Sequence, residues 1–161
     1  MYVPPSHLED IKVKTITTTR TTTMETEQHT KTLVIFGATG DLCRRKLIPA
    51  LETLDKKGLL PDNFKIIGAA RRENTRQSWL DSLGKYYEAD FSLKLDYHRC
   101  DLSDVDSLRS IPQSDDMTYF LSVPPERYAD VIQNLKAAGL VENAETSRVV
   151  IEKPFGHDYE S

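Results

Sequence analysis

From Thr32 onward, short apolar runs alternate with segments that have apolar residues three or four positions apart. The apolar or alternating runs predict strands over 32–37, 64–70, 93–102, 117–123 and 147–153. The segments between them predict helices over 41–58, 76–90, 104–111 and 125–140. Pro49 falls inside the first of these helices, and we expect it to kink or divide that helix near Ile48.

Strict alternation of strands and helices predicts an α/β fold, with a parallel sheet covered by helices on both faces. Right-handed crossovers then give a doubly wound, Rossmann-like sheet with strand order 3-2-1-4-5. In such sheets, ligands bind beyond the carboxyl ends of the strands, where the winding reverses. The residues that follow each strand are therefore the candidates for a site.

Residues 1–30 lack this pattern. The stretch "TITTTRTTTMETEQHT" (15–30) is rich in threonine and polar, which predicts a disordered tail ahead of a single dinucleotide-binding domain over 31–161. It has no apolar core of a secretory signal, and Glu9, Asp10, Glu25 and Glu27 argue against a transit peptide. Met24 is an alternative start of the chain.

The composition favours a cytoplasmic domain without metal, nucleic acid or membrane partners. Of the 161 residues, 39% are hydrophobic and 29% charged, as in ordinary soluble domains. The net charge of -4 gives no support for nucleic acid, and no apolar stretch reaches the length of a membrane span. Cys43 and Cys100, the only cysteines, cannot supply a disulfide framework or a four-ligand zinc site, so we interpret them as free thiols.

The first strand is followed by "GATGDL" (37–42). Gly37 and Gly40 let the backbone turn tightly and approach a pyrophosphate, and a helix starting near Asp41 offers free N–H groups to it. Thr39 can add a hydroxyl. The spacing is G-x-x-G instead of the full G-x-G-x-x-G, and Cys43 holds the place of a third glycine, so a plain tight turn is the alternative.

The second strand is followed by Arg71 and Arg72. Domains that prefer NAD usually carry an acid here for the ribose 2′-hydroxyl. A guanidinium can grip a 2′-phosphate with two hydrogen bonds, which favours NADP over NAD. The alternative is a pair of solvated surface arginines.

Two further strand ends carry candidates for the rest of the cofactor. After the third strand, Asp101 can accept from the exocyclic amine of adenine and Leu102 can pack on the ring, although Asp101 could equally be the N-cap of the next helix. After the fourth strand, Pro124 and Pro125 fix a rigid exit. Tyr128, one turn later, could reach the cofactor or simply pack.

The fifth strand ends in "EKPFG" (152–156). The Lys153 ammonium is placed to orient an anionic or hydroxyl-rich substrate, with a surface lysine as the alternative. Pro154 fixes the turn, in a trans or cis form. Glu152 could pair with a neighbouring base.

Four segments, taken together and in this order, resemble the amino-terminal domain of the glucose-6-phosphate dehydrogenase family. They are "LVIFGATGDLCRRKLIPAL", "IIGAARRE", "FLSVPPERY" and "RVVIEKPFG", and the resemblance runs from about Lys31 to Ser161. It implies oxidation of glucose 6-phosphate to 6-phosphogluconolactone with hydride transfer to NADP, the first step of the oxidative pentose phosphate pathway. It also implies a homo-oligomer for a full-length enzyme.

The resemblance also implies roles for individual residues. It assigns Arg71 to the 2′-phosphate, Tyr128 and Lys153 to the nicotinamide end, and Lys153 to the sugar as well. It places basic residues, here Arg44, Arg45 and Lys46, at the start of the first helix. The cofactor turn comprises Gly37, Ala38, Thr39, Gly40, Asp41 and Leu42.

The family's substrate-phosphate motif and catalytic His–Asp pair lie further along the chain than Ser161. We therefore expect a fragment or truncated reading frame that has no catalytic residue and is inactive alone. His157 does not replace the missing base, because the sequence offers it no recognisable catalytic partner.

Two alternative functions stay open. Another NADP-dependent sugar oxidoreductase or epimerase would need a catalytic Tyr–Lys pair, and no Y-x-x-x-K occurs in the sequence. The other alternative is a non-enzymatic nucleotide-binding module.

Overall fold

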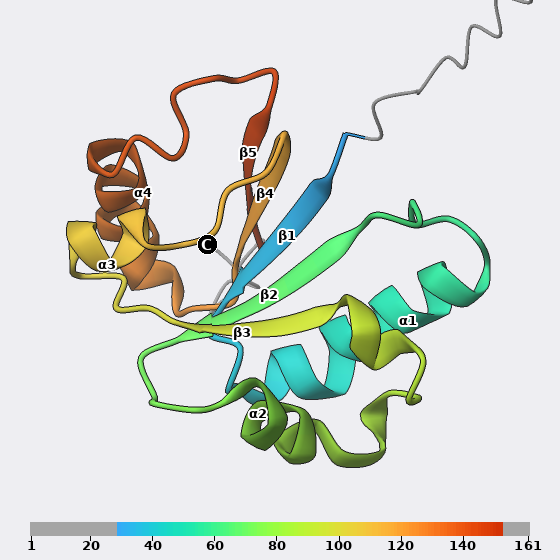
Figure 1. Cartoon of the computed structure of the whole chain (residues 1–161). Helices are drawn as coiled ribbons and strands as arrows, with labels where there is room; N and C mark the ends of the chain where they lie inside the picture. Colours follow the sequence, from blue (N-terminus) through green and yellow to red (C-terminus); the bar gives the residue numbers. More distant parts are fainter. Residues whose placement is uncertain (1–28, 153–161) are drawn as a thin grey trace, which may run out of the picture.

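The computed structural model describes residues 29–152, and these form one five-stranded parallel sheet flanked by helices (Figure 1). The strand order is β3-β2-β1-β4-β5, as the crossover rule predicts. The strands are β1 (Lys31–Phe36), β2 (Lys65–Ala70), β3 (Leu95–Arg99), β4 (Asp116–Leu121) and β5 (Ser147–Ile151). The expected tail and the residues from Lys153 onward lie outside the described residues.

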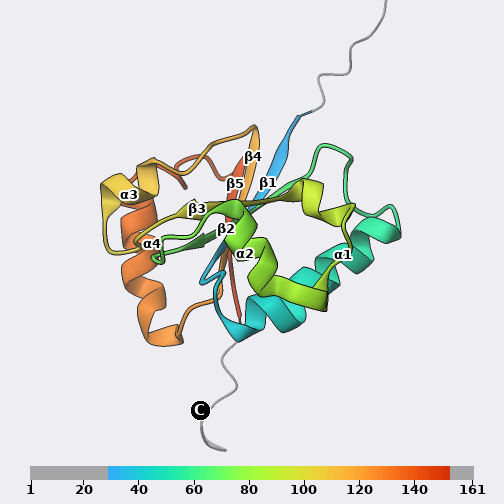
Figure 2. The ribbon, with the colours of Figure 1, turned by 60° about the horizontal axis from the view of Figure 1, so that its bottom comes forward.

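Helices cover both faces of the sheet, as Figures 1 and 2 show from two directions. One face carries α1 (Ile48–Lys56) and α2 (Arg76–Leu83), and the other carries α3 (Val105–Arg109) and α4 (Tyr128–Ala137). β1 lies in the centre and contributes to both cores, because successive side chains of a strand point to opposite faces. Ile35 packs with the α1 and α2 side, whereas Phe36 packs with the α3 and α4 side.

Pro49 divides the first helix, as expected. The helix begins at Asp41, widens into a π-helical stretch over Cys43–Leu47 and continues as α1. The Ile48 N–H donates to the carbonyl of Cys43, five residues earlier. Proline lacks an N–H and its ring would clash with the carbonyl four residues before it, so the wider turn relieves both problems.

Three predicted elements were wrong in extent. The helix expected over 76–90 ends at Leu83, because Gly84 adopts a φ of 59° that no α-helix permits. The strand expected over 93–102 is shorter, since a 3₁₀ turn over Phe91–Lys94 occupies its start. The helix expected over 125–140 begins as a 3₁₀ turn over Pro125–Arg127 and ends at Ala137.

Trp79 ties α2 to the turn that follows β1. Its side chain is fully buried, and its Nε1 donates a hydrogen bond of 3.1 Å to the carbonyl of Ala38. A buried indole N–H without a partner would be costly, so this bond fixes both the ring and the turn. The turn after β1 is thereby fixed to the hydrophobic core through Trp79.

Candidate functional site

A cleft of about 370 Å³ lies at the carboxyl ends of the strands, where the sheet order reverses. Its lining comes from the end of β2 and from the segments that follow β1, β2, β3 and β4, although these are far apart in the sequence. The lining residues are Gly37, Thr39, Gly40, Ala69, Ala70, Arg71, Arg72, Cys100, Asp101, Leu102, Ser122, Val123, Pro124 and Arg127. The strand ends that the sequence singles out therefore converge on one hollow.

The turn after β1 needs glycine at Gly37 for two reasons. Its φ is 84°, in the region that disfavours side chains, and a Cβ there would lie 2.2 Å from the carbonyl oxygen of Ser122. The Gly37 N–H donates to the carbonyl of Ala69 at 3.0 Å, and the Gly37 carbonyl accepts from Gly40 N–H at 2.9 Å. The turn is thus fixed between its two neighbouring strands.

Of the six residues expected in this turn, Gly37, Thr39 and Gly40 line the cleft. Ala38 is 1% exposed and faces the core, so any contact of this residue with a ligand would have to come from its backbone. Asp41 and Leu42 begin the helix and are not among the lining residues. The Asp41 carboxylate accepts a hydrogen bond of 2.5 Å from Arg44 instead.

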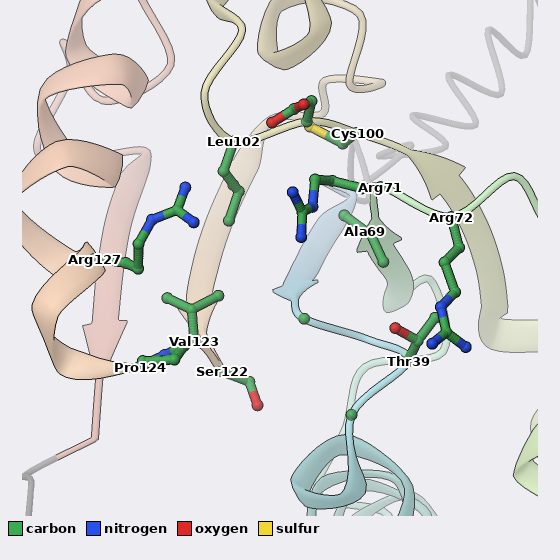
Figure 3. A pocket seen from close by; sticks show the side chains of 14 residues that line it. Thr39, Ala69, Arg71, Arg72, Cys100, Leu102, Ser122, Val123, Pro124 and Arg127 are labelled. Carbon is green, nitrogen blue, oxygen red and sulfur yellow. The ribbon is translucent and has the colours of Figure 1, made fainter.

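Arg71 and Arg72 both line the cleft and are both exposed (Figure 3). Their backbone is held by the neighbouring strand: the Tyr97 hydroxyl donates to the carbonyl of Arg72 at 2.6 Å. Burial raises the pKa of Tyr97, which keeps its hydroxyl protonated as a donor. Two exposed cationic side chains therefore project from a fixed backbone.

The loop after β3 is folded on itself around Asp101. Its Oδ1 accepts from the N–H of Ser103 at 2.9 Å, and its own N–H donates to Ser107 Oγ at 2.9 Å. The N-cap of α3 is Asp104, which accepts from the N–H of Asp106, so the alternative that made Asp101 the cap is wrong. Asp101 and Leu102 both line the cleft.

The exit from β4 contributes a residue that the sequence analysis missed. Arg127 lines the cleft and its Nη2 donates to Ser103 Oγ at 3.1 Å. An arginine so soon after a strand on the ligand side is the signal that could have identified it. Pro124 lines the cleft as well, in keeping with a rigid exit.

Tyr128 does not line this cleft. It packs against the core on the α3 and α4 side, and its hydroxyl donates to the carbonyl of Glu152 at 3.4 Å. Its contact with a cofactor stays a prediction, as does that of Lys153, which lies outside the described residues. The structure does place Tyr128 against the residue that precedes Lys153.

Arginines dominate the charge of the cleft lining. Arg71, Arg72 and Arg127 face a single acidic residue, Asp101, which makes the cleft attractive to anions. Burial raises the pKa of Cys100 in the lining to about 11 and that of Cys43 to about 12, so both thiols are neutral. Between residues 29 and 152, no cluster of metal-ligating side chains is found.

No helix within the described segment is long and apolar enough to cross a membrane.

His98 lies in β3, and its Nε2 is 2.9 Å from Ser110 Oγ, outside the cleft lining. The described residues thus offer a polar, cationic cleft that is shaped for binding and contains no histidine.

Comparison with known proteins indicates the family to which the chain is related. The family described as "Glucose-6-phosphate dehydrogenase, NAD binding domain" matches residues 34–161. A glucose-6-phosphate 1-dehydrogenase of Chlamydia pneumoniae is 37% identical over 158 residues, which cover 80% of this chain and 31% of that protein. The Bacillus subtilis enzyme of the same name is 34% identical, with 86% of this chain and 32% of that protein covered.

Solved structures agree. Glucose-6-phosphate 1-dehydrogenase from Mycobacterium avium superimposes with a TM-score of 0.68 at 32% identity, covering 81% of this chain and 31% of that one. A glucose-6-phosphate dehydrogenase in complex with its substrate glucose-6-phosphate gives a TM-score of 0.67 at 26% identity. The chain spans about a third of the length of these relatives. Through the match over residues 34–161, the chain belongs to the NAD-binding domain family of glucose-6-phosphate dehydrogenases.

Proposed function

We propose that the chain binds NADP in this cleft and is the cofactor-binding part of a glucose-6-phosphate dehydrogenase. The observation that carries the proposal is that the glycine turn and Arg71 line the same hollow at the point where the sheet order reverses. Family membership favours this function over the alternatives of an epimerase or another sugar oxidoreductase.

The glycine turn fits a pyrophosphate. A Cβ at Gly37 would lie 2.2 Å from the carbonyl oxygen of Ser122, and a Cβ at Gly40 would lie 3.1 Å from the carbonyl oxygen of Gly37. Neither position therefore has room for a side chain. The helix that starts at Asp41 directs its first N–H groups and its positive dipole end toward such a group. Thr39, in the cleft lining, supplies a hydroxyl to a phosphate oxygen.

The two arginines after β2 support NADP in preference to NAD. Arg71 and Arg72 line the cleft, whereas Glu73, the next residue, does not. A guanidinium binds a 2′-phosphate through two charge-assisted hydrogen bonds, and an acid in the same place would repel it. Asp101 and Leu102 are assigned to the adenine end of the cofactor.

The substrate and the reaction belong to the same proposal. When bound, the nicotinamide accepts a hydride from the first carbon of glucose 6-phosphate, which gives 6-phosphogluconolactone. Lys153 is assigned to the sugar and Tyr128 to the nicotinamide end, while the general base and the sugar-phosphate site are assigned to the part of the relatives that this chain does not span. A cytoplasmic location and a homo-oligomeric full-length enzyme complete the proposal.

Calorimetric titration of the 161-residue chain with NADP and NAD tests the binding function. We expect NADP to bind about 10- to 100-fold more tightly, since a charge-assisted bidentate contact contributes about 1.5–3 kcal/mol. Equal affinities would remove the NADP preference, and no binding of either dinucleotide would remove the proposal itself. Glucose 6-phosphate alone, as a control, should give no heat of binding.

A further inference from the structure

Arg127 is an exposed arginine that the proposed function leaves without a role. It ends the 3₁₀ turn Pro125–Arg127 after β4 and lines the same cleft as Arg71. Figure 3 shows the two guanidinium groups reaching into the cleft from opposite walls, with the Leu102 side chain between them. Three successive segments of the fold thus present two planar cations and one apolar side chain to a common space.

The Arg127 side chain is anchored to the loop after β3. Its Nη2 donates to Ser103 Oγ at 3.1 Å, and the Ser103 N–H donates to Asp101 Oδ1 at 2.9 Å. The carbonyl of Leu102 accepts from Asn134 Nδ2 of α4 at 2.8 Å, so the loop and the helix are also joined. An anchored guanidinium loses less freedom when it contacts a ligand than a free one does.

A flat aromatic ring suits this arrangement better than a phosphate does. Guanidinium groups are planar and weakly hydrated, and they stack on the faces of aromatic rings. The pyrophosphate already has the glycine turn on another part of the lining, and the 2′-phosphate is assigned to the N–H donors of Arg71, whose planar face stays open to a ring. We propose that Arg127 is the second arm of a clamp that holds the adenine base of the cofactor, with Arg71 opposite and Leu102 against the ring. This inference rests on the proposed cofactor site.

The clamp can be tested by titrating NADP and 2′,5′-ADP into the 161-residue chain and into three variants. Arg127→Ala removes the planar face, Arg127→Lys keeps the charge without the plane, and Arg109→Ala removes an exposed arginine outside the cleft lining. We expect Arg127→Ala to weaken both ligands about 3- to 10-fold, Arg127→Lys to recover little of the loss and Arg109→Ala to change nothing. Because Arg127 is exposed, its variants should melt like the parent chain.

Two results would overturn the clamp. Unchanged affinity in Arg127→Ala would show that the residue does not touch the ligand. A loss that disappears at high salt, or that Arg127→Lys restores, would assign Arg127 to a phosphate, since salt screens charge pairs more than stacking. A parent chain that binds neither ligand would remove the proposed function together with the clamp, whereas NADP binding that is indifferent to Arg127 would remove the clamp alone.

Discussion

The indole of Trp79 lies directly over Gly68 in β2, so closely that a Cβ on Gly68 would be 2.4 Å from the ring. The strand therefore has a glycine at this position because helix α2 occupies the space of a side chain. This contact and the bond from Trp79 to Ala38 hold α2, β2 and the turn after β1 in one fixed arrangement. The glycine turn of the cleft is positioned by core packing on its far side.

Gly68→Ala should destabilise the fold because the added methyl group would clash with the buried ring of Trp79. We expect a loss of about 1–3 kcal/mol in the free energy of unfolding, as for other overpacked cores. Chemical denaturation of the purified chain measures it. A double-mutant cycle with Trp79→Phe, which has a smaller ring, provides the control: the cost of Gly68→Ala should fall in that background. A cost of Gly68→Ala that is the same with either ring would show that Trp79 is not its cause.

Arg71→Glu should reverse the nucleotide preference. The substitution replaces a donor for the 2′-phosphate with a group that repels it, so NADP affinity should fall about 10- to 100-fold while NAD becomes the better ligand. Titration calorimetry of both dinucleotides provides the measurement. Arg109→Glu, the same charge change outside the cleft lining, is the matched control and should leave the preference intact. An unaltered preference in Arg71→Glu would assign the 2′-phosphate to another residue.

The 161-residue chain by itself should not turn over. General base catalysis typically contributes about 10²- to 10⁴-fold, and no cleft-lining residue in the described part of the chain is a histidine. Reduction of NADP by glucose 6-phosphate is followed by the absorbance of the reduced nicotinamide, with a full-length relative as the positive control. Reduction at an enzyme-like rate would contradict this expectation and would place a base within the chain.

Lys153 should matter for turnover more than for folding in a full-length dehydrogenase that carries this segment. On the sequence, the lysine ends the last predicted strand with an ammonium instead of an apolar group, so Lys153→Ala should remove little core volume. We expect near-native melting, a modest change in NADP affinity and a large fall in kcat for Lys153→Ala. Lys153→Arg should not rescue, because a planar fork does not replace a compact point charge. Near-normal activity in Lys153→Ala would make the residue structural.

The sequence predicted the sheet well, because the strands and helices follow from local patterns and the strand order is restricted by the handedness of the crossovers. Apolar runs and helical spacing mark the elements, and right-handed crossovers restrict five alternating strands to a few orders, among them the one observed. It predicted the end of α2 poorly, because Gly84 stands within an otherwise helical pattern and only its positive φ ends the helix. A single sequence does not reveal which conformation a glycine will adopt.

The sequence predicted the site residues that directly follow a strand. It did not predict which way a side chain points or which loops contact one another in the fold. Gly37 and Arg71 follow strands directly, so their position at the cleft could be expected. Ala38 lies in the same turn, yet its side chain faces the core, and Tyr128 points to the end of β5. Arg127 follows β4 and could have been named on the same ground, but its contact with Ser103 in the loop after β3 is one that no sequence spacing reveals.

The central place of β1 has a consequence for how the protein emerges from the ribosome. One edge of the strand pairs with β2, the next strand in the sequence, but its other edge pairs with β4, and the contact between Thr30 and Asp115 spans 85 positions. At about 5–20 residues per second, that edge waits roughly 4–17 s for its partner. During this interval the nascent chain exposes an unpaired row of backbone groups in the middle of its future sheet, where a foreign strand could pair in place of β4.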